Sequence, residues 1–202
     1  MHFAQPRHRT DVLTRAADAG RYASVATSHS NKGRDMGDVD ILSGYFPGAI
    51  GRVVELHGAY YHTHWRFGAF FEAKVARELA EFFGRYDPRR DGFWTASVSG
   101  RVEGSITIDG AHAGDDGAHL RWFIMSDALR GKGVGNRLIR RALDFCRSNE
   151  YRRVYLWTFE GLHAARHLYE RAGFQLVEQH RGTQWGAEVA EQRFELSLTE
   201  RV

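Results

Sequence analysis

The stretch Leu-Arg-Trp-Phe-Ile-Met-Ser-Asp-Ala-Leu-Arg-Gly-Lys-Gly-Val-Gly, residues 120–135, decides the fold of this 202-residue chain. Its apolar first part, Leu120–Met125, predicts a strand, and a helical pattern begins near Val134. Between them glycine stands at alternate positions. Glycine tolerates left-handed backbone angles, so successive N–H groups can converge there, and the helix behind adds the positive end of its dipole. We expect this loop to bind phosphate.

Three kinds of phosphate-binding loop compete for this stretch. A mononucleotide P-loop requires Gly-x-x-x-x-Gly-Lys-Ser/Thr, which the chain does not contain. The dinucleotide fingerprint requires a third glycine where Asn136 stands, and an acidic residue after the next strand, which ends in Trp-Thr-Phe instead. The third pattern is Arg/Gln-x-x-Gly-x-Gly/Ala between a strand and a helix. Arg130–Gly135 matches it at every fixed position.

A second motif lies two predicted elements further along the chain. Residues 165–174, Ala-Arg-His-Leu-Tyr-Glu-Arg-Ala-Gly-Phe, reproduce the pattern Ala-x-x-Leu/Phe-Tyr-x-x-x-Gly-Phe. Together the two motifs resemble the GNAT N-acetyltransferase superfamily, whose acyl-coenzyme A pyrophosphate loop has the first pattern. The resemblance extends over about residues 39–198. It is strongest to acetyltransferase domains that occur alone or behind MarR-type DNA-binding domains.

The resemblance implies a mixed α/β acyl-CoA N-acyltransferase fold. Such a fold has a central, mostly antiparallel, splayed sheet of about seven strands, flanked by about four helices. Residues 1–38 lack a usable apolar period and are expected to be a flexible arm or linker, and residues 39–202 to be the acetyltransferase domain. Periodicity predicts strands at 39–46, 93–97, 101–108, 119–126, 153–159, 174–179 and 192–197, and helices at 50–60, 69–86, 134–146 and 162–172, with a link at Tyr60–Trp65.

Composition sets few limits on partners. The formal net charge of +3 at pH 7 is mild, so the pairs Arg140-Arg141 and Arg152-Arg153 are expected to be solvated rather than to bind nucleic acid. A basic nucleic-acid-binding module stays open as a third hypothesis. No apolar run approaches the roughly 18 residues that span a membrane, and no signal peptide is expected. With a single cysteine, Cys146, a cytoplasmic location is expected.

The resemblance implies an enzyme, an acyltransferase that moves an acetyl group from acetyl-CoA to a primary amine within a ternary complex. Acetyl-CoA is the implied donor substrate. The acceptor can be a small amine, an amino acid, an antibiotic or a protein, and the sequence does not decide among them. A homodimer is possible and is also left open. A non-catalytic acyl-CoA-binding sensor or regulatory module is the alternative. No metal is expected, because His163 and His167, although one helical turn apart, fit solvated helix residues better.

The resemblance also assigns the donor site. In the family the strand before the loop parts from the next strand, and the pantetheine arm lies in the gap. Relatives commonly carry Asn seven residues before the motif tyrosine, where this chain has Leu162, so that one contact to the arm is in doubt. The residues expected to hold acetyl-CoA are Phe123, Met125, Arg130, Gly131, Lys132, Gly133, Val134, Gly135 and Asn136.

Two residues are expected to act in catalysis. Tyr169 aligns with the family tyrosine that protonates the departing thiolate. His119 occupies the position at which several relatives carry the base, and histidine titrates near neutral pH. Glu72, Glu103 and a water-mediated route are the alternatives for the base. The residues expected to contact the acceptor are Trp65, Phe71, Glu72 and Arg121.

Overall fold

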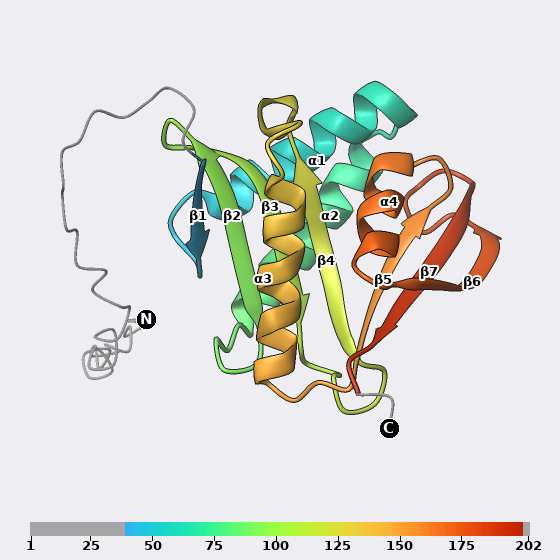
Figure 1. The fold of residues 1–202 in the computed structure, drawn as a ribbon. Helices are drawn as coiled ribbons and strands as arrows, with labels where there is room; N and C mark the ends of the chain where they lie inside the picture. Colours follow the sequence, from blue (N-terminus) through green and yellow to red (C-terminus); the bar gives the residue numbers. More distant parts are fainter. Residues whose placement is uncertain (1–38, 200–202) are drawn as a thin grey trace, which may run out of the picture. The chain divides into compact units, whose positions relative to one another are not determined.

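The computed structural model describes residues 39–199, so the expected N-terminal arm lies outside the described residues. Its strands form one sheet in the order β1-β2-β3-β4-β5-β7-β6 (Figure 1). All neighbours are antiparallel except β4 and β5, which confirms the expected mixed sheet of seven strands. The elements are β1 (Val39–Ser43), α1 (Ala49–Trp65), α2 (Ala69–Gly84), β2 (Gly92–Val98), β3 (Arg101–Asp109), β4 (Ala118–Met125), the 3-10 turn η1 (Asp127–Leu129), α3 (Val134–Ser148), β5 (Arg153–Phe159), α4 (His163–Arg171), β6 (Gln175–Gly182) and β7 (Val189–Ser197).

Two helices cover each face of the sheet (Figure 1). α1 and α2 bury apolar residues such as Val53 and Phe82 against one face. α3 and α4 bury Leu138 and Tyr169 against the other. Each helix contributes one apolar stripe, which is why helical periodicity located them in the sequence. Within residues 39–199, no helix has the length and apolarity to cross a membrane.

The expected link at Tyr60–Trp65 is wrong, because these residues form the last turns of α1. Residues 60–67 contain no glycine or proline that would end the helix earlier. α1 ends at Arg66, whose backbone is left-handed (φ 57°) and whose N–H donates to the carbonyl of His62 at 3.0 Å. Helical side chains therefore project from 60–65 at 100° intervals, and only some of them can face the sheet.

The hairpin of β6 and β7 is also longer than expected. Its ladder continues outward to the pair Gly182 and Val189. Its outer residues, His-Arg-Gly at 180–182 and Val-Ala-Glu at 189–191, show no apolar alternation that would mark them as strand. The hairpin therefore brings the loop at 183–188 further along the sheet than the sequence suggested.

β4 and β5 pair only at their first residues. Ala118 lies opposite Val154 and His119 opposite Tyr155, and the strands then diverge. On its other edge β4 carries a bulge, with one extra residue between Arg121 and Ile124 relative to β3. Trp122 there has a positive φ of 44°, and its carbonyl accepts a hydrogen bond from Ser105 Oγ at 2.8 Å. Because a bulge bends and twists its strand, it directs β4 away from β5.

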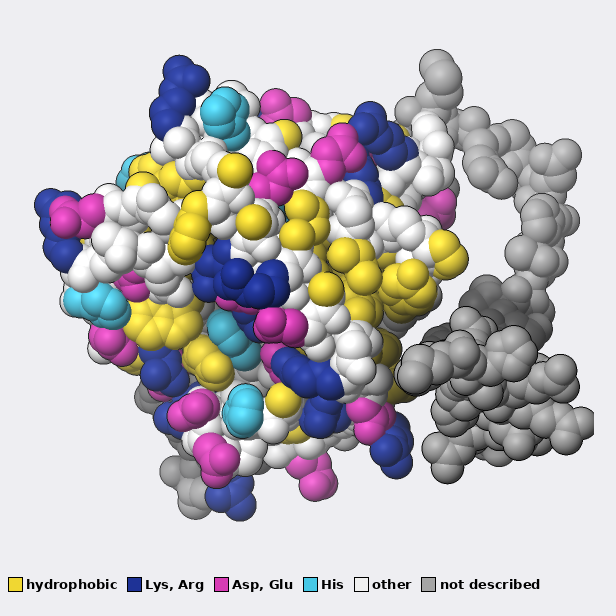
Figure 2. Space-filling view, turned by 180° about the vertical axis from the view of Figure 1, so that it is seen from behind, with side chains coloured by type: hydrophobic (Ala, Val, Ile, Leu, Met, Phe, Trp, Pro, Cys, Tyr) yellow, Lys and Arg dark blue, Asp and Glu magenta, His cyan; other side chains and the backbone are white. Residues whose placement is uncertain are grey.

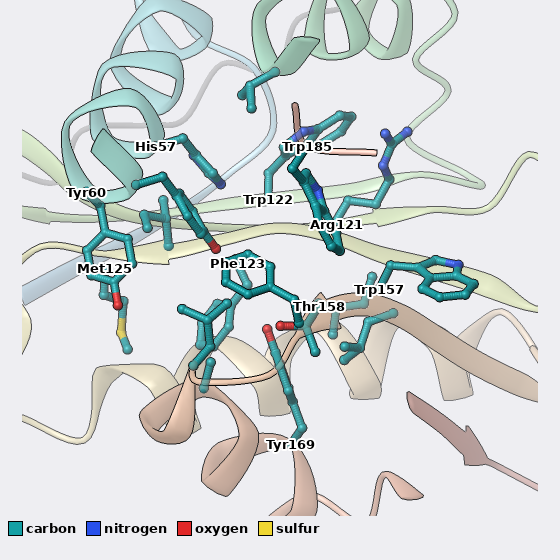
Figure 3. Close-up of a pocket in the computed structure, with 18 of the residues that line it drawn as sticks. His57, Tyr60, Arg121, Trp122, Phe123, Met125, Trp157, Thr158, Tyr169 and Trp185 are labelled. Atoms are coloured by element: carbon teal, nitrogen blue, oxygen red, sulfur yellow. The ribbon is translucent and has the colours of Figure 1, made fainter. Parts of the chain in front are cut away.

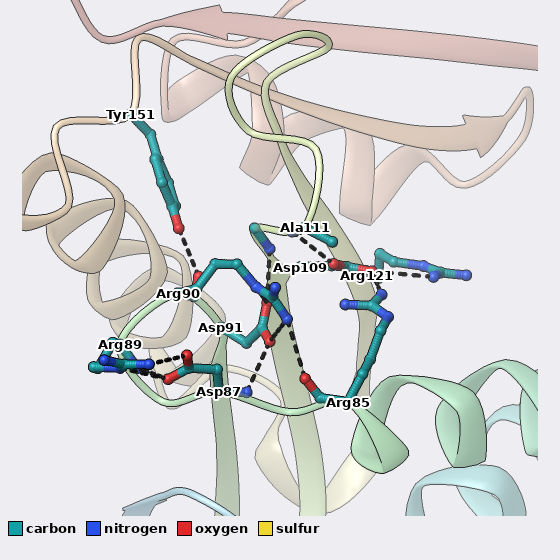
Figure 4. A network of polar contacts seen from close by, with 10 residues as sticks. Arg85, Asp87, Arg89, Arg90, Asp91, Asp109, Ala111, Arg121 and Tyr151 are labelled. Atoms are coloured by element: carbon teal, nitrogen blue, oxygen red, sulfur yellow. Dashed lines mark hydrogen bonds and ion pairs between the residues drawn. The ribbon is translucent and has the colours of Figure 1, made fainter.

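A network of polar contacts joins β2, β3 and the turn before β5 at the end where β4 and β5 still pair (Figure 4). The carboxylate of Asp91 is buried and accepts hydrogen bonds from the N–H groups of Gly110 and Asp87, both at 3.0 Å. It also forms an ion pair with the guanidinium of Arg90 at 2.9 Å. The backbone carbonyl of Arg90 in turn accepts a hydrogen bond from the hydroxyl of Tyr151 at 2.7 Å. The network fixes the closed end of the gap.

Replacing this buried carboxylate is therefore expected to destabilise the fold. Asp91→Ala leaves two backbone N–H groups and a guanidinium without their acceptor, and should lower the free energy of unfolding by about 3 kcal/mol. Urea unfolding followed by circular dichroism measures the change. Arg89→Ala removes an exposed ion pair from the same turn and should leave the midpoint unchanged. Equal midpoints for Asp91→Ala and the wild type would contradict the assigned role.

Candidate active site

A cavity of about 370 Å³ occupies the gap between β4 and β5. This volume is typical of sites for small molecules. Its walls come from α1, α2, β4, β5, α4 and the loop between β6 and β7, as Figure 3 shows for the labelled side chains. The cavity is therefore reached by residues from both faces of the sheet.

The glycine-rich loop presents unpaired backbone donors beside this cavity. Gly131 and Gly133 have φ values of 70° and 67°, which only glycine adopts without strain. α3 begins at Val134, and the first N–H with an in-chain partner is that of Arg137, which donates to the carbonyl of Gly133 at 3.2 Å. Among the described residues, the N–H groups of 134–136 have no acceptor. Free N–H groups at a helix N-terminus bind anions.

Close packing holds this loop in place. A Cβ atom on Gly135 would lie 2.8 Å from Met125 Cε and 2.9 Å from Leu168 Cδ1. The start of α3 thus lies directly against β4 and α4, where a larger residue would displace the side chains of Met125 and Leu168. Phe123, Met125 and Arg130 line the cavity, so the structure brings strand and loop residues of the predicted donor site together. That they hold acetyl-CoA stays a prediction.

Tyr169 is buried in the wall that α4 contributes. Its ring packs 5.9 Å from that of Phe123 and 6.0 Å from that of Phe174. Its hydroxyl points into the cavity toward Phe123 and Thr158 (Figure 3). Burial raises the pKa of Tyr169, and nearby Tyr61 raises it further. The phenol is therefore protonated at neutral pH and serves as a hydrogen-bond donor.

His119, the predicted base, lies at the closed end of the cavity. Its ring stacks on that of Tyr155, with 4.3 Å between centroids, where β4 and β5 are still paired. Burial and, to a lesser extent, the charge of Arg121 lower the pKa of His119 to about 3. The ring is therefore neutral at neutral pH.

Charges of both signs line the side of the cavity next to α2. Glu78 is held between Lys74 and Arg121. The guanidinium of Arg121 also lies 4.2 Å from the ring centroid of Trp122 and 3.6 Å from a carboxylate oxygen of Asp109. Figure 2 shows this face, where acidic and basic side chains lie side by side near the centre.

Asp109 connects this charge cluster to the closed end of the gap. Burial raises its pKa, but the hydrogen bond from Arg85 and the charges of Arg85 and Arg121 outweigh burial, so the pKa of Asp109 is lowered. The carboxylate is thus ionised at neutral pH. It keeps Arg121 at the cavity wall.

Only part of the predicted acceptor site lies at the cavity. Phe71 and Arg121 line it. Glu72 is exposed on α2, one residue round the helix from Phe71, and approaches Gly58 of α1 instead. Trp65 packs edge-on against Phe159, 4.7 Å between centroids, behind the cavity wall. Neither of these two residues is among those that line the cavity.

The loop between β6 and β7 closes one wall. The buried carboxylate of Glu191 accepts hydrogen bonds from the backbone N–H of Gln184 at 2.9 Å and from its side-chain amide at 2.6 Å. Trp185 then packs 5.1 Å from Phe159, and Gly186 approaches Phe70 of α2. The sequence offered no sign that this loop returns to α2.

His57, within the expected helix at 50–60, also lines the cavity, and the sequence assigned it no role. A histidine between Val53 and Tyr60 in an apolar helical stripe is the signal that could have marked it. His163 and His167, in contrast, are exposed on α4. Residues 39–199 contain no group of three or more side chains suited to hold a metal ion.

Two histidines with lowered pKa values predict an acid-sensitive fold. Burial lowers the pKa of His57 to about 4, against 6.5 for an exposed histidine, and that of His119 to about 3. Below a pH of about 6.5 these histidines are protonated in the unfolded chain but stay neutral in the folded chain until the pH reaches their lowered pKa values. The free energy of unfolding therefore falls as the pH falls from about 6.5. His57→Asn and His119→Asn should each flatten this dependence, measured by urea unfolding between pH 7.5 and 4.5. If the free energy of unfolding of both variants depended on pH as steeply as that of the wild type, the two histidines would not be neutral in the folded chain.

Comparison with known proteins agrees with this geometry. The family model described as "Acetyltransferase (GNAT) family" matches residues 53–174, more than half of the chain. N-acetylaspartate synthetase from Danio rerio is 29% identical over 119 residues, 58% of this chain and 42% of that protein. The protein of that name from Rattus norvegicus is 32% identical over 117 residues, 57% of this chain and 39% of its own length. The chain spans about two fifths of the length of these curated relatives.

Solved structures share the fold. An acetyltransferase from Streptococcus agalactiae has a TM-score of 0.61 at 21% identity, and the match covers 79% of this chain and 98% of that one. The yncA protein of Salmonella typhimurium, solved with its cofactor acetyl-CoA, has a TM-score of 0.63 at 17% identity, covering 81% and 95%. With both motifs, the divergent strands and the family match in agreement, this chain belongs to the GNAT family of acetyltransferases.

Proposed function

We propose that this protein transfers the acetyl group of acetyl-CoA to the primary amine of a small acceptor, within a ternary complex. The observation that carries the proposal is the gap between β4 and β5, which has free backbone donors at one end and Tyr169 in its wall. The yncA protein was solved with acetyl-CoA, which supports the choice of donor.

The residues present fit this donor. The pyrophosphate of acetyl-CoA would accept hydrogen bonds from the N–H groups at the start of α3, with Arg130 and Lys132 adding positive charge. The pantetheine arm would lie along β4, whose edge facing β5 is unpaired beyond His119. Backbone groups of Phe123 and Met125 would contact the arm and the thioester oxygen. One N–H donor aimed at the developing oxyanion lowers the activation free energy by about 3 kcal/mol.

Tyr169 would act on the leaving group. Because its pKa is raised, its hydroxyl keeps the proton until a strong acceptor forms beside it. A departing thiolate is such an acceptor. The packing of the ring against Phe123 and Phe174 holds the hydroxyl in one direction, which favours proton delivery at a fixed point.

The acceptor side favours an amine that also carries an acidic group. Lys74 and Arg121 line the cavity, where their charges would attract a carboxylate. The same positive charges disfavour an ammonium ion and so favour the reactive neutral amine. Two relatives are named N-acetylaspartate synthetase, and this name also points to an acidic amino acid.

Removing the Tyr169 hydroxyl tests the catalytic role. Tyr169→Phe should lower kcat by about 100-fold and leave the KM for acetyl-CoA within about twofold, because only the proton donor is lost. CoA release, followed with a thiol reagent, measures both. If the wild type binds acetyl-CoA but releases no CoA with any amine, the chain is a sensor and not an enzyme.

A panel of amines tests the acceptor class. L-Aspartate should be acetylated faster than phenethylamine, and Arg121→Gln should raise the KM for L-aspartate by about tenfold or more. Arg85→Gln is the matched control, because Arg85 binds the same Asp109 carboxylate without lining the cavity. Equal rates for both amines, or equal KM values in the two variants, would rule out recognition of a carboxylate by Arg121.

A further inference from the structure

His57 offers an unpaired nitrogen to the cavity. The side chain is 5% exposed, and its Nδ1 lies 2.8 Å from the carbonyl oxygen of Val53. Because a carbonyl only accepts, Nδ1 must carry the proton, and the lone pair of the neutral ring is on Nε2. Among residues 39–199, no group hydrogen-bonds Nε2. His57 lines the cavity, so a group bound there can hydrogen-bond this nitrogen.

The position of His57 complements that of Tyr169. α1 and α4 lie on opposite faces of the sheet (Figure 1), and the two side chains enter the same cavity from opposite sides, with Phe123 between them (Figure 3). In acyl transfer the incoming nitrogen and the departing sulfur occupy different sides of the reacting carbon. A proton acceptor and a proton donor are needed on those two sides.

We propose that Nε2 of His57 takes the proton that the acceptor amine loses during acetyl transfer. This inference rests on the proposed function. The neutral amine nitrogen forms a bond to the thioester carbon and becomes positively charged, and one of its N–H protons moves to Nε2. The C–S bond then breaks, its electrons go to sulfur, and the sulfur takes a proton from Tyr169. His57 returns its proton through water, which restores Tyr169.

The surroundings of His57 fit this role. Its pKa is lowered to about 4 by burial, which the Val53 carbonyl opposes, so the ring is neutral and ready to accept at neutral pH. So weak a base can deprotonate the cationic nitrogen of the addition step, but not a free ammonium ion. Stacking on Tyr61, with 6.2 Å between centroids, orients the ring. His119, by comparison, lies where the strands have not yet parted.

A pair of matched variants tests the proposal. His57→Asn keeps an amide N–H that can donate to the Val53 carbonyl but removes the nitrogen that faces the cavity. Its kcat for the fastest amine among L-aspartate, L-glutamate, β-alanine and phenethylamine should fall by about 100-fold. The Kd for acetyl-CoA, measured by calorimetry, should stay within about twofold. His62→Asn is the control, because His62 lies on the same helix without lining the cavity, and this variant should keep kcat within about threefold.

Rescue with added imidazole separates a chemical role from a structural one. In His57→Ala, imidazole at about 100 mM should restore at least about a tenth of the lost rate, while His62→Ala should not respond. A kcat of His57→Asn equal to the wild type, or an equal loss in His62→Asn without rescue, would overturn the assignment. A wild type that binds acetyl-CoA but acetylates none of the amines would instead overturn the proposed function itself.

Discussion

The parting of β4 from β5 is the constraint on which the rest of the site depends. A parallel pair normally continues for the length of the shorter strand, because each lost ladder position leaves backbone N–H and C=O groups without partners. Here only two residue pairs are in register. The bulge at Trp122, secured by the hydroxyl of Ser105, bends β4 at the point where it leaves β5. The polar strand edge that results is open to a ligand.

Different interactions hold the two ends of this gap. At the closed end, the ion pairs of Asp109 with Arg85 and Arg121 extend to Glu78 on α2, so a helix on one face is tied to the sheet beneath it. At the open end there is no ion-pair network of this kind among the described residues, and Gly135 allows α3 to touch β4 and α4 directly. Charge fixes one end and close packing fixes the other.

Sequence reasoning located the residues that depend on backbone geometry. The loop glycines and Tyr169 could be identified from the sequence, because a left-handed φ and the start of a helix each strongly restrict the residue type. His57 was not assigned a role, since a histidine in an apolar stripe is usually a core residue. Glu72 was expected at the acceptor because α2 was placed correctly, but its rotation about the helix axis depends on tertiary packing. Trp185 could not be foreseen, since its position depends on a loop anchored by Glu191.

The placement of helices on both faces of the sheet affects how substrates bind and products leave. On the proposed function, the donor enters beside α3 and α4, and the acceptor enters beside α1 and α2. Neither substrate would then stand in the path of the other, so the two could bind in either order. CoA could also leave while the acetylated product is still bound. The sheet would then lie between the two substrates, and the reaction would take place in the gap between β4 and β5.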